Sequence, residues 1–409
     1  MRPLVAGVTE AGIAALPDRV LQRIATASCI IAATRFHDAL PETAEIIDWP
    51  KPFSNIFSII DNKADKSLVI LTTGDPMWFG AGASLASRLG PDGCEVVPAV
   101  SGLQLAAAHL GWPMQDCRIV SIHGRPLEHL RAALFPNGRL LVIAQDGNSP
   151  AAVAKALCAW GHNKAQIYVM AYLGGTQEAF FSGTAADWQH NDVPDFHIIG
   201  IACDGAAPAN GLAAPDDHFV NDGKLTKRDA RASALVKLAP FPKAVLWDIG
   251  SGSGAVSVDF LRAAPGGRAI GIDRNQDQLD MALANAERHG VAGFTPVKAD
   301  LAEDPAALFD SLPTPDAVFV GGGLSADILA LAKARLRPGG VLVAHAVTIE
   351  SEALMVSAWQ GTGGDLTRIT VQHADPVGGF HGWRPLMPIT QWVWLKPSGG
   401  GTGQVGRTP

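Results

Sequence analysis

Residues 243–274, KAVLWDIGSGSGAVSVDFLRAAPGGRAIGIDR, decide how the second half of this chain folds. The apolar run from Ala244 to Trp247 predicts a buried strand. The three glycines that follow it predict a turn that opens a helix: Gly250, Gly252 and Gly254. Glycine lets the backbone approach a ligand without a Cβ in the way, and the first turn of a helix offers free N–H groups to a carboxylate or phosphate. The stretch therefore predicts a loop that binds a nucleotide cofactor.

Three aspartates at successive strand ends indicate which cofactor this loop takes. Asp273 ends a second predicted strand, about 20 residues after the glycines, where a carboxylate can accept both ribose hydroxyls. Asp248 precedes the first glycine, where it would repel a pyrophosphate but pair with the ammonium or sulfonium of S-adenosylmethionine (SAM). Asp300 ends a third strand and would meet the exocyclic amine of adenine. The spacing also satisfies the dinucleotide pattern G-x-G-x-x-A, so NAD stays open at this point.

The order of the predicted strands bears on that choice. Apolar strands are expected at residues 245–247, 269–272, 294–298, 316–320, 341–345, 366–372 and 391–395. The first five are separated by segments of helix length, and the last two by a long loop without an obvious helix. Seven strands with a closing hairpin fit the class I methyltransferase sheet better than a six-stranded dinucleotide fold, so the order favours SAM.

Composition limits the class of protein. The 409 residues carry a net charge of −7, with 47% hydrophobic and 17% charged residues, which predicts a globular chain of two or three domains and gives no electrostatic footprint for nucleic acid. The five cysteines show no C-x-x-C spacing, which favours free thiols in a reducing cytosol and no metal site. Without an apolar run of roughly 18 residues or a charged-then-apolar leader, we expect a soluble, cytoplasmic protein without membrane partners.

The chain divides near its middle. Residues 206–222 are rich in Ala, Pro, Asn and Asp and lack periodicity, which is typical of a linker. We therefore expect one domain at residues 1–205 and a second at 223–397. Residues 398–409 are rich in glycine and are expected to form a flexible tail.

The first domain alternates apolar strands with loops and helices, which is typical of an α/β sheet. Strands are expected at residues 4–6, 29–32, 67–71, 95–97 and 140–144. Ligands in such sheets bind at the carboxyl ends of the strands, so the loops that follow should line one cleft. Taken alone, Gly74-Asp75-Pro76 is a common turn, and Ser101 is a helix N-cap.

The order and spacing of these loops resemble those of the tetrapyrrole methyltransferases. The matching landmarks are the glycine turn at Gly7, the loop Thr73–Gly80, the V-P-x-x-S loop at Val97–Ser101, and Leu173-Gly174 with Glu178. The resemblance implies a two-lobed class III fold with SAM in the cleft. The residues that it would place at the cofactor are Gly74, Asp75, Pro76, Ser101 and Leu173.

One departure from that family concerns the opening loop. It usually reads G-x-G-x-G-D, whereas here residues 7–12 read GVTEAG, so the usual acidic group cannot be transferred by position. Glu10 remains a candidate for substrate or proton handling, although a solvated loop carboxylate is the simpler interpretation. Tyr172, in the AYLGG loop, carries the same ambiguity.

The second half resembles the precorrin-8w-type decarboxylating methylases. The similarity lies in the T-x-x-D/E-x-R motif at Thr226–Arg231, in D-I-G-S-G-S-G, in I-D-R-N at Ile272–Asn275 and in F-V-G-G-G at Phe319–Gly323. A run of three glycines also lets a large flat ligand lie directly on the backbone. The resemblance places the cofactor at Asp248, Gly250, Ser251, Gly252, Gly254, Asp273, Arg274 and Asp300. It places the substrate at Thr226, Arg228, Arg231, Gly321, Gly322 and Gly323.

Together the two halves resemble the decarboxylating precorrin C(5,15)-methyltransferase family of cobalamin biosynthesis. The resemblance implies two SAM sites, methylation of a precorrin at carbons 5 and 15, and loss of carbon dioxide from a ring acetate. It assigns carbon 15 and the decarboxylation to the second domain and carbon 5 to the first, in a homo-oligomer, either a dimer or a tetramer. The general acid or base stays unassigned: His345 is a candidate, yet a lone strand-end histidine is more often structural. An NAD-dependent oxidoreductase and a non-catalytic SAM-binding protein remain alternatives.

Overall fold

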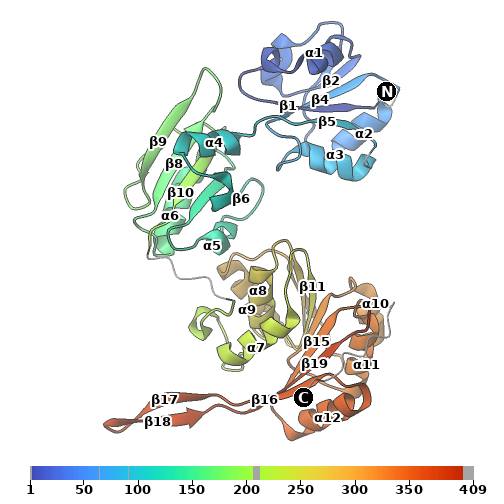
Figure 1. The fold of residues 1–409 in the computed structure, drawn as a ribbon, viewed down its shortest axis with the longest axis vertical. Coiled ribbons are helices and arrows are strands. Elements are labelled where there is room, and N and C mark those ends of the chain that lie inside the picture. Colours follow the sequence, from blue (N-terminus) through green and yellow to red (C-terminus); the bar gives the residue numbers. More distant parts are fainter. Residues whose placement is uncertain (1, 64, 91, 206–211, 399–409) are drawn as a thin grey trace. The chain divides into compact units, whose positions relative to one another are not determined.

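The computed structural model describes residues 2–63, 65–90, 92–205 and 212–398. The chain forms two compact units, residues 1–209 (unit 1) and 210–409 (unit 2), and each unit combines helices with strands (Figure 1). Residues 206–211 of the expected linker, and residues 399–409 of the expected tail, lie outside the described residues.

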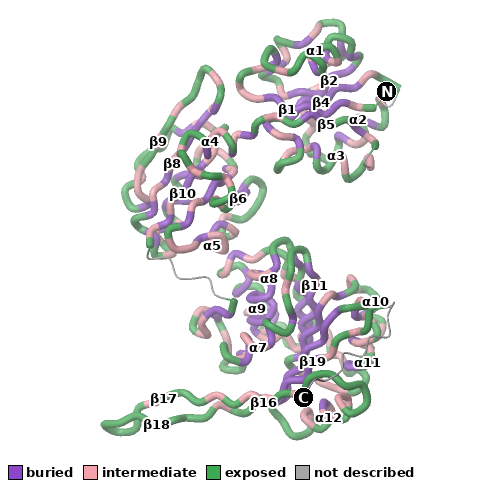
Figure 2. Tube along the Cα trace, in the orientation of Figure 1, coloured by how far each residue is buried: buried purple, intermediate pink, exposed green. Residues whose placement is uncertain are grey.

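Unit 1 begins with a parallel sheet in the order β3-β2-β4-β1-β5. Its strands are β1 (Leu4–Val8), β2 (Cys29–Ile31), β3 (Glu45–Ile47), β4 (Leu68–Thr73) and β5 (Glu95–Val97). Its helices are η1 (Ile13–Ala15), α1 (Asp18–Ala25), η2 (Thr34–Ala39), α2 (Asn55–Asn62) and α3 (Ala81–Leu89). Alternate residues of β1 pack on opposite faces, with Leu4 in the core under α1 and Val5 in the core under α2 and α3. Because both faces are covered, the inner strands β1, β2 and β4 are almost entirely buried, while the edge strands β3 and β5 each begin with an exposed glutamate (Figure 2).

The rest of unit 1 is built on a mixed sheet in the order β6-β7-β10-β8-β9. Its strands are β6 (Cys117–Ser121), β7 (Arg139–Ile143), β8 (Gln166–Ala171), β9 (Ala179–Thr184) and β10 (His197–Ala202). Its helices are α4 (Gly102–Leu110), η3 (Met114–Asp116), α5 (His129–Ala133) and α6 (Ser149–Ala159). α4 packs on one face, and α5 with α6 on the other. The sequence predicted only β7 here, because the alternation in β6, β8, β9 and β10 is weak.

Unit 2 contains a seven-stranded sheet in the order β13-β12-β11-β14-β15-β19-β16, in which β19 runs antiparallel to both of its neighbours. Its strands are β11 (Val245–Ile249), β12 (Arg268–Asp273), β13 (Phe294–Lys298), β14 (Ala317–Val320), β15 (Val341–Ala346), β16 (Asp365–Ile369) and β19 (Ile389–Leu395). Its helices are η4 (Asp216–His218), α7 (Arg228–Leu238), α8 (Ala255–Ala263), α9 (Gln276–Arg288), α10 (Pro305–Ser311), α11 (Ala326–Arg335) and α12 (Ile349–Thr362). Leu246 packs with α7 and α8, and Trp247 with α10 to α12.

The long loop expected between the last two strands of that sheet is a second, two-stranded element. β17 (Gln372–Val377) and β18 (Phe380–Pro385) pair with each other as an antiparallel hairpin. Figure 1 shows this hairpin extending away from the body of unit 2. Its aromatic side chains are exposed, Phe380 by 81% and Trp383 by 73%. These residues show no alternation of apolar and polar side chains that would indicate a buried face. For that reason the sequence predicted a loop here.

A buried arginine attaches the first residues of unit 2 to its core. The Nε–H of Arg231 donates to Asp259 Oδ2 (2.6 Å), and both side chains are fully buried. The other Arg231 nitrogens donate to Asp216 Oδ1 (3.0 Å) and to the carbonyl oxygens of Thr226 (2.6 Å) and Ala214. Residues 212–222, which the sequence analysis assigned to the linker, therefore pack against unit 2.

The described residues contain no helix that is both long and apolar enough to cross a membrane. Within the same ranges, no group of three or more His, Cys, Asp or Glu side chains is arranged to hold a metal ion.

The Arg231–Asp259 pair yields a stability test. R231M should lower the free energy of unfolding of unit 2 by about 3–5 kcal/mol, because it leaves the Asp259 carboxylate buried without its main partner. R262M is the matched control: Arg262 also binds Asp259 (2.6 Å) but is partly exposed, so its loss should cost less. Urea unfolding of the three proteins measures the difference. Equal stability of R231M and wild type would contradict this account.

Candidate functional site

Unit 2 has a cavity of about 660 Å³ at the carboxyl ends of β11, β12, β13 and β14. It is lined by four loops that the sequence analysis singled out separately. The predicted residues that line it are Gly250, Gly252, Asp273, Arg274, Asp300, Gly321, Gly322 and Gly323. The fold therefore brings the predicted cofactor residues and the predicted substrate glycines to one place.

Two of the glycine loops touch backbone to backbone. Gly250 has φ +69°, and a Cβ on it would lie 2.5 Å from the nitrogen of Gly322. The N–H of Gly321 donates to the carbonyl oxygen of Ile249 (2.8 Å), which holds the second loop against the first. Gly254, with φ +73°, begins α8, where a Cβ would lie 2.6 Å from that of Ala282 on α9. Only glycine permits these approaches, so the loops form one continuous floor.

Backbone amides orient the two acidic groups of this cavity. Asp273 accepts from the N–H of Gly252 at Oδ2 (3.0 Å) and from the N–H of Asn275 at Oδ1 (2.9 Å). Asp300 accepts from the N–H of Ala302 at Oδ1 (3.1 Å). A carboxylate has about four lone-pair sites, so each group keeps acceptors for the hydroxyls or amine of a ligand.

Asp248 is not on the wall of the cavity, where the sequence analysis expected it. It is 1% exposed, and its Oδ2 accepts from the N–H (3.2 Å) and the hydroxyl (2.6 Å) of Ser257 in the first turn of α8. Burial raises the pKa of Asp248 to about 6, against the opposing effect of the Ser257 bonds. Asp248 therefore supports the glycine loop from beneath. Ser251 and Gly254 shape the same turn, through a bond from Gly254 N–H to the Ser251 carbonyl (2.9 Å), and do not line the cavity.

The motif at the start of α7 is not part of the cavity lining either. The expectation that Arg231 holds a substrate carboxylate is wrong, because that side chain is fully buried and bound within unit 2. The Nε–H of Arg228 donates to the carbonyl oxygen of Ala213 (3.0 Å), and Thr226 offers its carbonyl oxygen to Arg231. Lys224, just before this motif, does line the cavity and was missed, because a lone lysine in a polar segment carries no sequence signal.

His345 lies in the core of unit 2 and outside the cavity lining. Its Nε2–H donates to Gln391 Oε1 (2.9 Å), and burial lowers its pKa. The Gln391 oxygen also accepts from the hydroxyl of Ser233 on α7 (3.2 Å). The structure thus favours the structural interpretation of His345 over the catalytic one.

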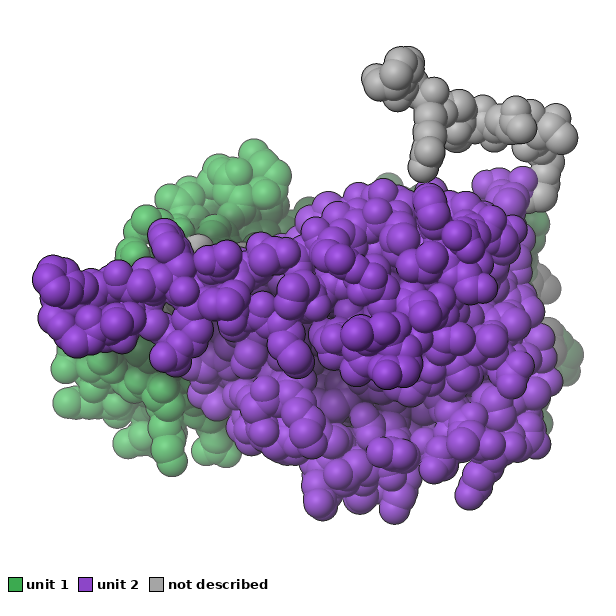
Figure 3. Space-filling model, turned by 90° about the horizontal axis from the view of Figure 1, so that it is seen from below, with its two compact units in different colours: residues 1–209 green, residues 210–409 purple. Residues whose placement is uncertain are grey.

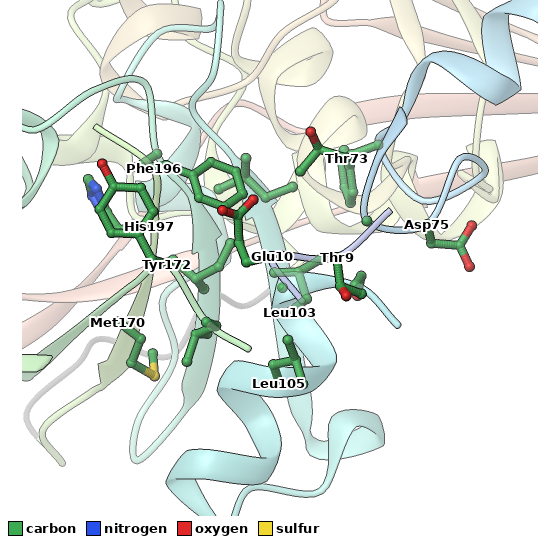
Figure 4. Close-up of a pocket in the computed structure, with 18 of the residues that line it drawn as sticks. Thr9, Glu10, Thr73, Asp75, Leu103, Leu105, Met170, Tyr172, Phe196 and His197 are labelled. Atoms are coloured by element: carbon green, nitrogen blue, oxygen red, sulfur yellow. The ribbon is translucent and has the colours of Figure 1, made fainter. Parts of the chain in front are cut away.

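Unit 1 has a cavity of about 430 Å³ that both of its sheets line. The loops after β1, β4 and β5 approach it from one side, and the ends of β8 and β10 from the other (Figure 4). The predicted residues that line it are Glu10, Gly74, Asp75, Ser101, Tyr172 and Leu173. Pro76 is buried beneath the loop instead, where a Cβ on Gly82 would meet it at 2.6 Å.

Local bonds fix the loops of this cavity. The N–H of Gly74, with φ +65°, donates to the carbonyl oxygen of Val8 (2.8 Å) and ties the loop after β4 to β1. Ser101 is confirmed as the N-cap of α4, since its hydroxyl accepts from Gln104 N–H (3.3 Å) and its own N–H donates to Gln104 Oε1 (2.9 Å). Tyr172 has a left-handed backbone, φ +50°, at the end of β8.

Glu10 is held by an arginine that the sequence analysis did not select. The Nε–H of Arg35 donates to Glu10 Oε1 (3.2 Å), and its Nη2 donates to Thr73 Oγ1 (2.7 Å). The same guanidinium lies 5.2 Å from the ring centroid of Phe196, at the start of β10. Glu10 is therefore part of an ion pair at the cavity wall. Arg35 has no motif around it, and only the packing of η2 against the opening loop reveals it.

His197 is a second residue of this wall that the sequence analysis missed. It is the first residue of β10, a strand that the sequence did not predict. Its side chain is 7% exposed.

Models of two protein families match the chain. The family described as tetrapyrrole (corrin/porphyrin) methylases matches residues 11–189, and a precorrin methyltransferase domain matches residues 217–396. The two matches fall in unit 1 and unit 2 respectively.

Two curated relatives match over nearly the full length, and a third matches less than half of the chain. The precorrin-6Y C(5,15)-methyltransferase (decarboxylating) of a Sinorhizobium species is 38% identical over 399 residues, which cover 96% of each chain. The protein of the same name from Mycobacterium tuberculosis is 33% identical over 402 residues, 96% of this chain and 99% of that one. A probable cobalt-precorrin-6B C(15)-methyltransferase (decarboxylating) of Pyrobaculum calidifontis is 34% identical over 182 residues, 43% of this chain and 91% of that one.

These similarities confirm the resemblance drawn from the motifs. Because the identity exceeds 30% and extends across both units, this chain belongs to the family of decarboxylating precorrin-6Y C(5,15)-methyltransferases.

Proposed function

We propose that this chain uses SAM to methylate a precorrin at carbons 5 and 15 and removes carbon dioxide from one ring acetate. The observation that carries the proposal is that each unit gathers residues from separate motifs into a cavity of its own, on a chain that matches this family over 96% of its length. Two cavities suit two methyl transfers, with one SAM site in each unit.

The strand orders support a distinct methyltransferase fold for each unit. When the strands of the seven-stranded sheet are numbered along the chain, their order in unit 2 is 3-2-1-4-5-7-6, and the seventh strand is antiparallel. This order suits a class I methyltransferase better than a six-stranded dinucleotide fold. In unit 1 two different sheets contribute to one cavity, which suits the two-lobed class III fold. The seven-stranded order favours SAM over NAD in unit 2.

In unit 2 we assign the cofactor to the floor made by the glycine loops. Asp273 would accept the ribose hydroxyls and Asp300 the adenine amine, because both carboxylates line the cavity and keep free lone pairs. The first N–H groups of α8 would face the methionine carboxylate of SAM. A Cβ on Gly250 would collide with the backbone of Gly322, so this floor exists only with glycine at position 250. A floor without side chains between two acidic groups on the cavity wall fits the molecule. When bound, SAM supplies an electrophilic methyl group.

The precorrin would lie beside the triple glycine. A Cβ on Gly323 would meet nothing within 4 Å, so this part of the loop is open to a flat macrocycle. Unit 2 would contribute mainly alignment, because methyl transfer is an in-line displacement that proximity and orientation accelerate. The acetate that loses carbon dioxide would benefit from desolvation and from the absence of a bound arginine. Arg231 cannot hold it, because its guanidinium is buried and bound to Asp259 and Asp216. Arg228 remains a candidate to hold other peripheral carboxylates.

In unit 1 we assign Gly74, Asp75, Ser101 and Leu173 to the cofactor, and Glu10 and Tyr172 to substrate or proton handling. All six line one cavity. Arg35 would keep the Glu10 carboxylate in place through its ion pair (3.1 Å).

Carbon 15 and the decarboxylation are assigned to unit 2, and carbon 5 to unit 1. The relative from Pyrobaculum, named for carbon-15 methylation with decarboxylation, matches 182 residues, about the length of the precorrin methyltransferase domain at residues 217–396. A protein of one domain thus carries the name of this half of the reaction.

We also propose that the chain self-associates through the β17–β18 hairpin. A two-stranded hairpin is marginal in water unless a third strand or another surface packs on it, and open strand edges favour pairing. The narrow arm of unit 2 in Figure 3 carries exposed Val377, Phe380 and Trp383. A second copy of the chain would cover these side chains.

The function is tested by mass spectrometry of a precorrin incubated with SAM. The full chain should add two methyl groups with loss of one carbon dioxide. Residues 210–409 expressed alone should add one methyl group with that loss, and residues 1–209 one methyl group without it. If neither half changes the precorrin while both bind SAM, the result would contradict the assignment of a precorrin as substrate. The assignment of SAM as cofactor would still hold.

The cofactor assignment in unit 2 is tested by D273N. It should weaken SAM binding at this site about 10- to 100-fold, because it replaces a charged acceptor by a neutral amide at the ribose. D277N is the matched control, since Asp277 lies exposed on the neighbouring turn of α9 and does not line the cavity. Calorimetric titration of each protein with SAM measures both. Unchanged affinity in D273N, or tight binding of NADH to wild type, would contradict the assignment.

Self-association is tested by sedimentation velocity of F380S/W383S. The double variant should sediment as a monomer, because it removes the apolar surface of the hairpin, while H381S, a substitution at an exposed position of β18, should keep the oligomer. A monomeric wild type, or a double variant that stays oligomeric, would reject the hairpin as the interface.

A further inference from the structure

Two aromatic side chains of the loop after β4 lie exposed at the cavity of unit 1. Trp78 and Phe79 line that cavity, and they are 37% and 49% exposed. Phe79 has φ +54°, a left-handed backbone that a bulky residue adopts only where its surroundings hold it there. The N–H of Trp78 donates to the carbonyl oxygen of Asp75 (3.3 Å), and a Cβ on Gly80 would lie 2.6 Å from the carbonyl oxygen of Pro76. This tight turn keeps both rings out of the core.

An arginine of the second sheet lies beside Phe79. The guanidinium carbon of Arg125 is 5.9 Å from the centroid of the Phe79 ring. Arg125 follows β6 and Phe79 follows β4, so the ring extends from the loops of the first sheet toward those of the second. Arg125 is exposed and forms no ion pair with any carboxylate that the structure describes. It lines a neighbouring cavity of about 590 Å³, and Gln145 lines both cavities, so the two adjoin. Trp78, Phe79 and Arg125 form the rim of the unit 1 cavity.

The wall that the second sheet contributes is also aromatic. Phe196 lies two residues before Ile198 of β10, and Tyr172 lies two residues after Met170 of β8. Because side chains alternate along a strand, Phe196 and Tyr172 share the sheet face of Ile198 and Met170, which packs with α4. Their ring centroids are 6.1 Å apart, and both residues line the cavity (Figure 4). Aromatic side chains therefore border the cavity from both sheets.

The charges inside the cavity differ from those at the rim. Three carboxylates line the cavity, those of Glu10, Asp75 and Asp195, and its described lining contains no lysine or arginine. Such a lining suits the sulfonium or ammonium group of SAM and repels a carboxylate. Arg35 is already paired with Glu10 (3.1 Å), whereas Arg125 at the rim is not paired. A precorrin, with carboxylates around a flat ring, finds its counter-charge at the rim and not inside.

We propose that the rim binds the precorrin that unit 1 methylates: the rings of Trp78 and Phe79 contact the flat face of the macrocycle, and Arg125 pairs with a peripheral carboxylate. The inference rests on the proposed function in one respect, namely that unit 1 takes a precorrin as substrate. Aromatic side chains pack against flat π-systems, and a guanidinium near a ring still has N–H groups for a carboxylate. The rim thus selects a large, flat, anionic molecule next to the cavity that we assign to SAM.

The charge of the rim is tested with R125Q in the full chain. This variant should raise the KM for precorrin in carbon-5 methylation about fivefold, because a substrate carboxylate loses its partner at an exposed site. R125K keeps the charge and should stay within about twofold of wild type. R88Q is the matched control and should leave KM unchanged. Arg88 is also exposed and lies 6.0 Å from the ring centroid of Phe57, but it does not line the cavity.

The rings of the rim are tested with W78L/F79L, which keeps apolar side chains and removes the flat surfaces. The double variant should raise the same KM about tenfold, because the macrocycle loses its aromatic contacts. F53L is the matched control, since Phe53 is 40% exposed and does not line the cavity. It should leave KM unchanged.

Mass spectrometry of the methylated precorrin measures KM at saturating SAM, and calorimetry measures the dissociation constant for SAM, which should stay unchanged in all variants. Added salt should raise the KM of wild type more steeply than that of R125Q, because salt screens an exposed ion pair. A merely structural role of Arg125 would not alter this salt dependence.

Two results overturn the role of the rim. If R125Q and W78L/F79L leave KM for precorrin unchanged, the rim does not contact the substrate. If they weaken SAM binding and leave KM at saturating SAM unchanged, the rim belongs to the cofactor site. Failure of the proposed function is a different result, because wild type with its rim intact would then not methylate a precorrin at carbon 5.

Discussion

The contact between the backbones of Gly250 and Gly322 is the constraint on which the site of unit 2 depends. β11 and β14 are neighbours in the sheet, so the loops that follow them leave the same edge side by side. A Cβ at Gly250 would lie 2.5 Å from the nitrogen of Gly322, which no real side chain permits. With glycine at both positions, the loop that we assign to the cofactor and the loop that we assign to the macrocycle share one floor. The proposed transfer requires the sulfonium methyl group to meet the acceptor carbon, and this contact would bring the two assigned surfaces together.

The two units reach a similar arrangement from different sheets. In unit 2 a single sheet presents the ends of four strands, β11 to β14, to one cavity. In unit 1 a parallel sheet supplies the loops with Gly74 and Asp75, while a mixed sheet supplies Tyr172 and His197. Ligands bind at the carboxyl ends of parallel strands, where loops diverge and helix N-termini point outward. The second sheet of unit 1 adds a second wall to its cavity, with Met170, Tyr172 and Ile198, which a single open sheet does not provide.

Aspartates at similar places in the sequence acquire different roles in the folded chain. Asp273 and Asp300 follow strands whose ends remain open, and they keep acceptors that face the cavity. Asp248 lies within β11, and its side chain is buried beneath α8. There its Oδ2 accepts a hydrogen bond from the hydroxyl of Ser257, and burial raises its pKa to about 6. Arg231 and Asp259 are a further instance, since two charged side chains of unremarkable spacing become a fully buried pair. Burial, and not residue type, distinguishes an aspartate that lines the cavity from one that supports the fold.

Local patterns in the sequence are enough to predict the α/β class, the seven strands of the unit 2 sheet and the glycine loop, because these features follow from the period of apolar residues along the chain. The fold alone brings Asp273, Asp300 and the triple glycine to one cavity. It also sets the burial of Asp248 and Arg231, forms the hairpin, and places Arg35 and His197. Arg35 and His197 reach the cavity through contacts between segments that are distant in the sequence, such as Arg35 with Glu10 and β10 with β8. A local sequence pattern cannot predict such contacts.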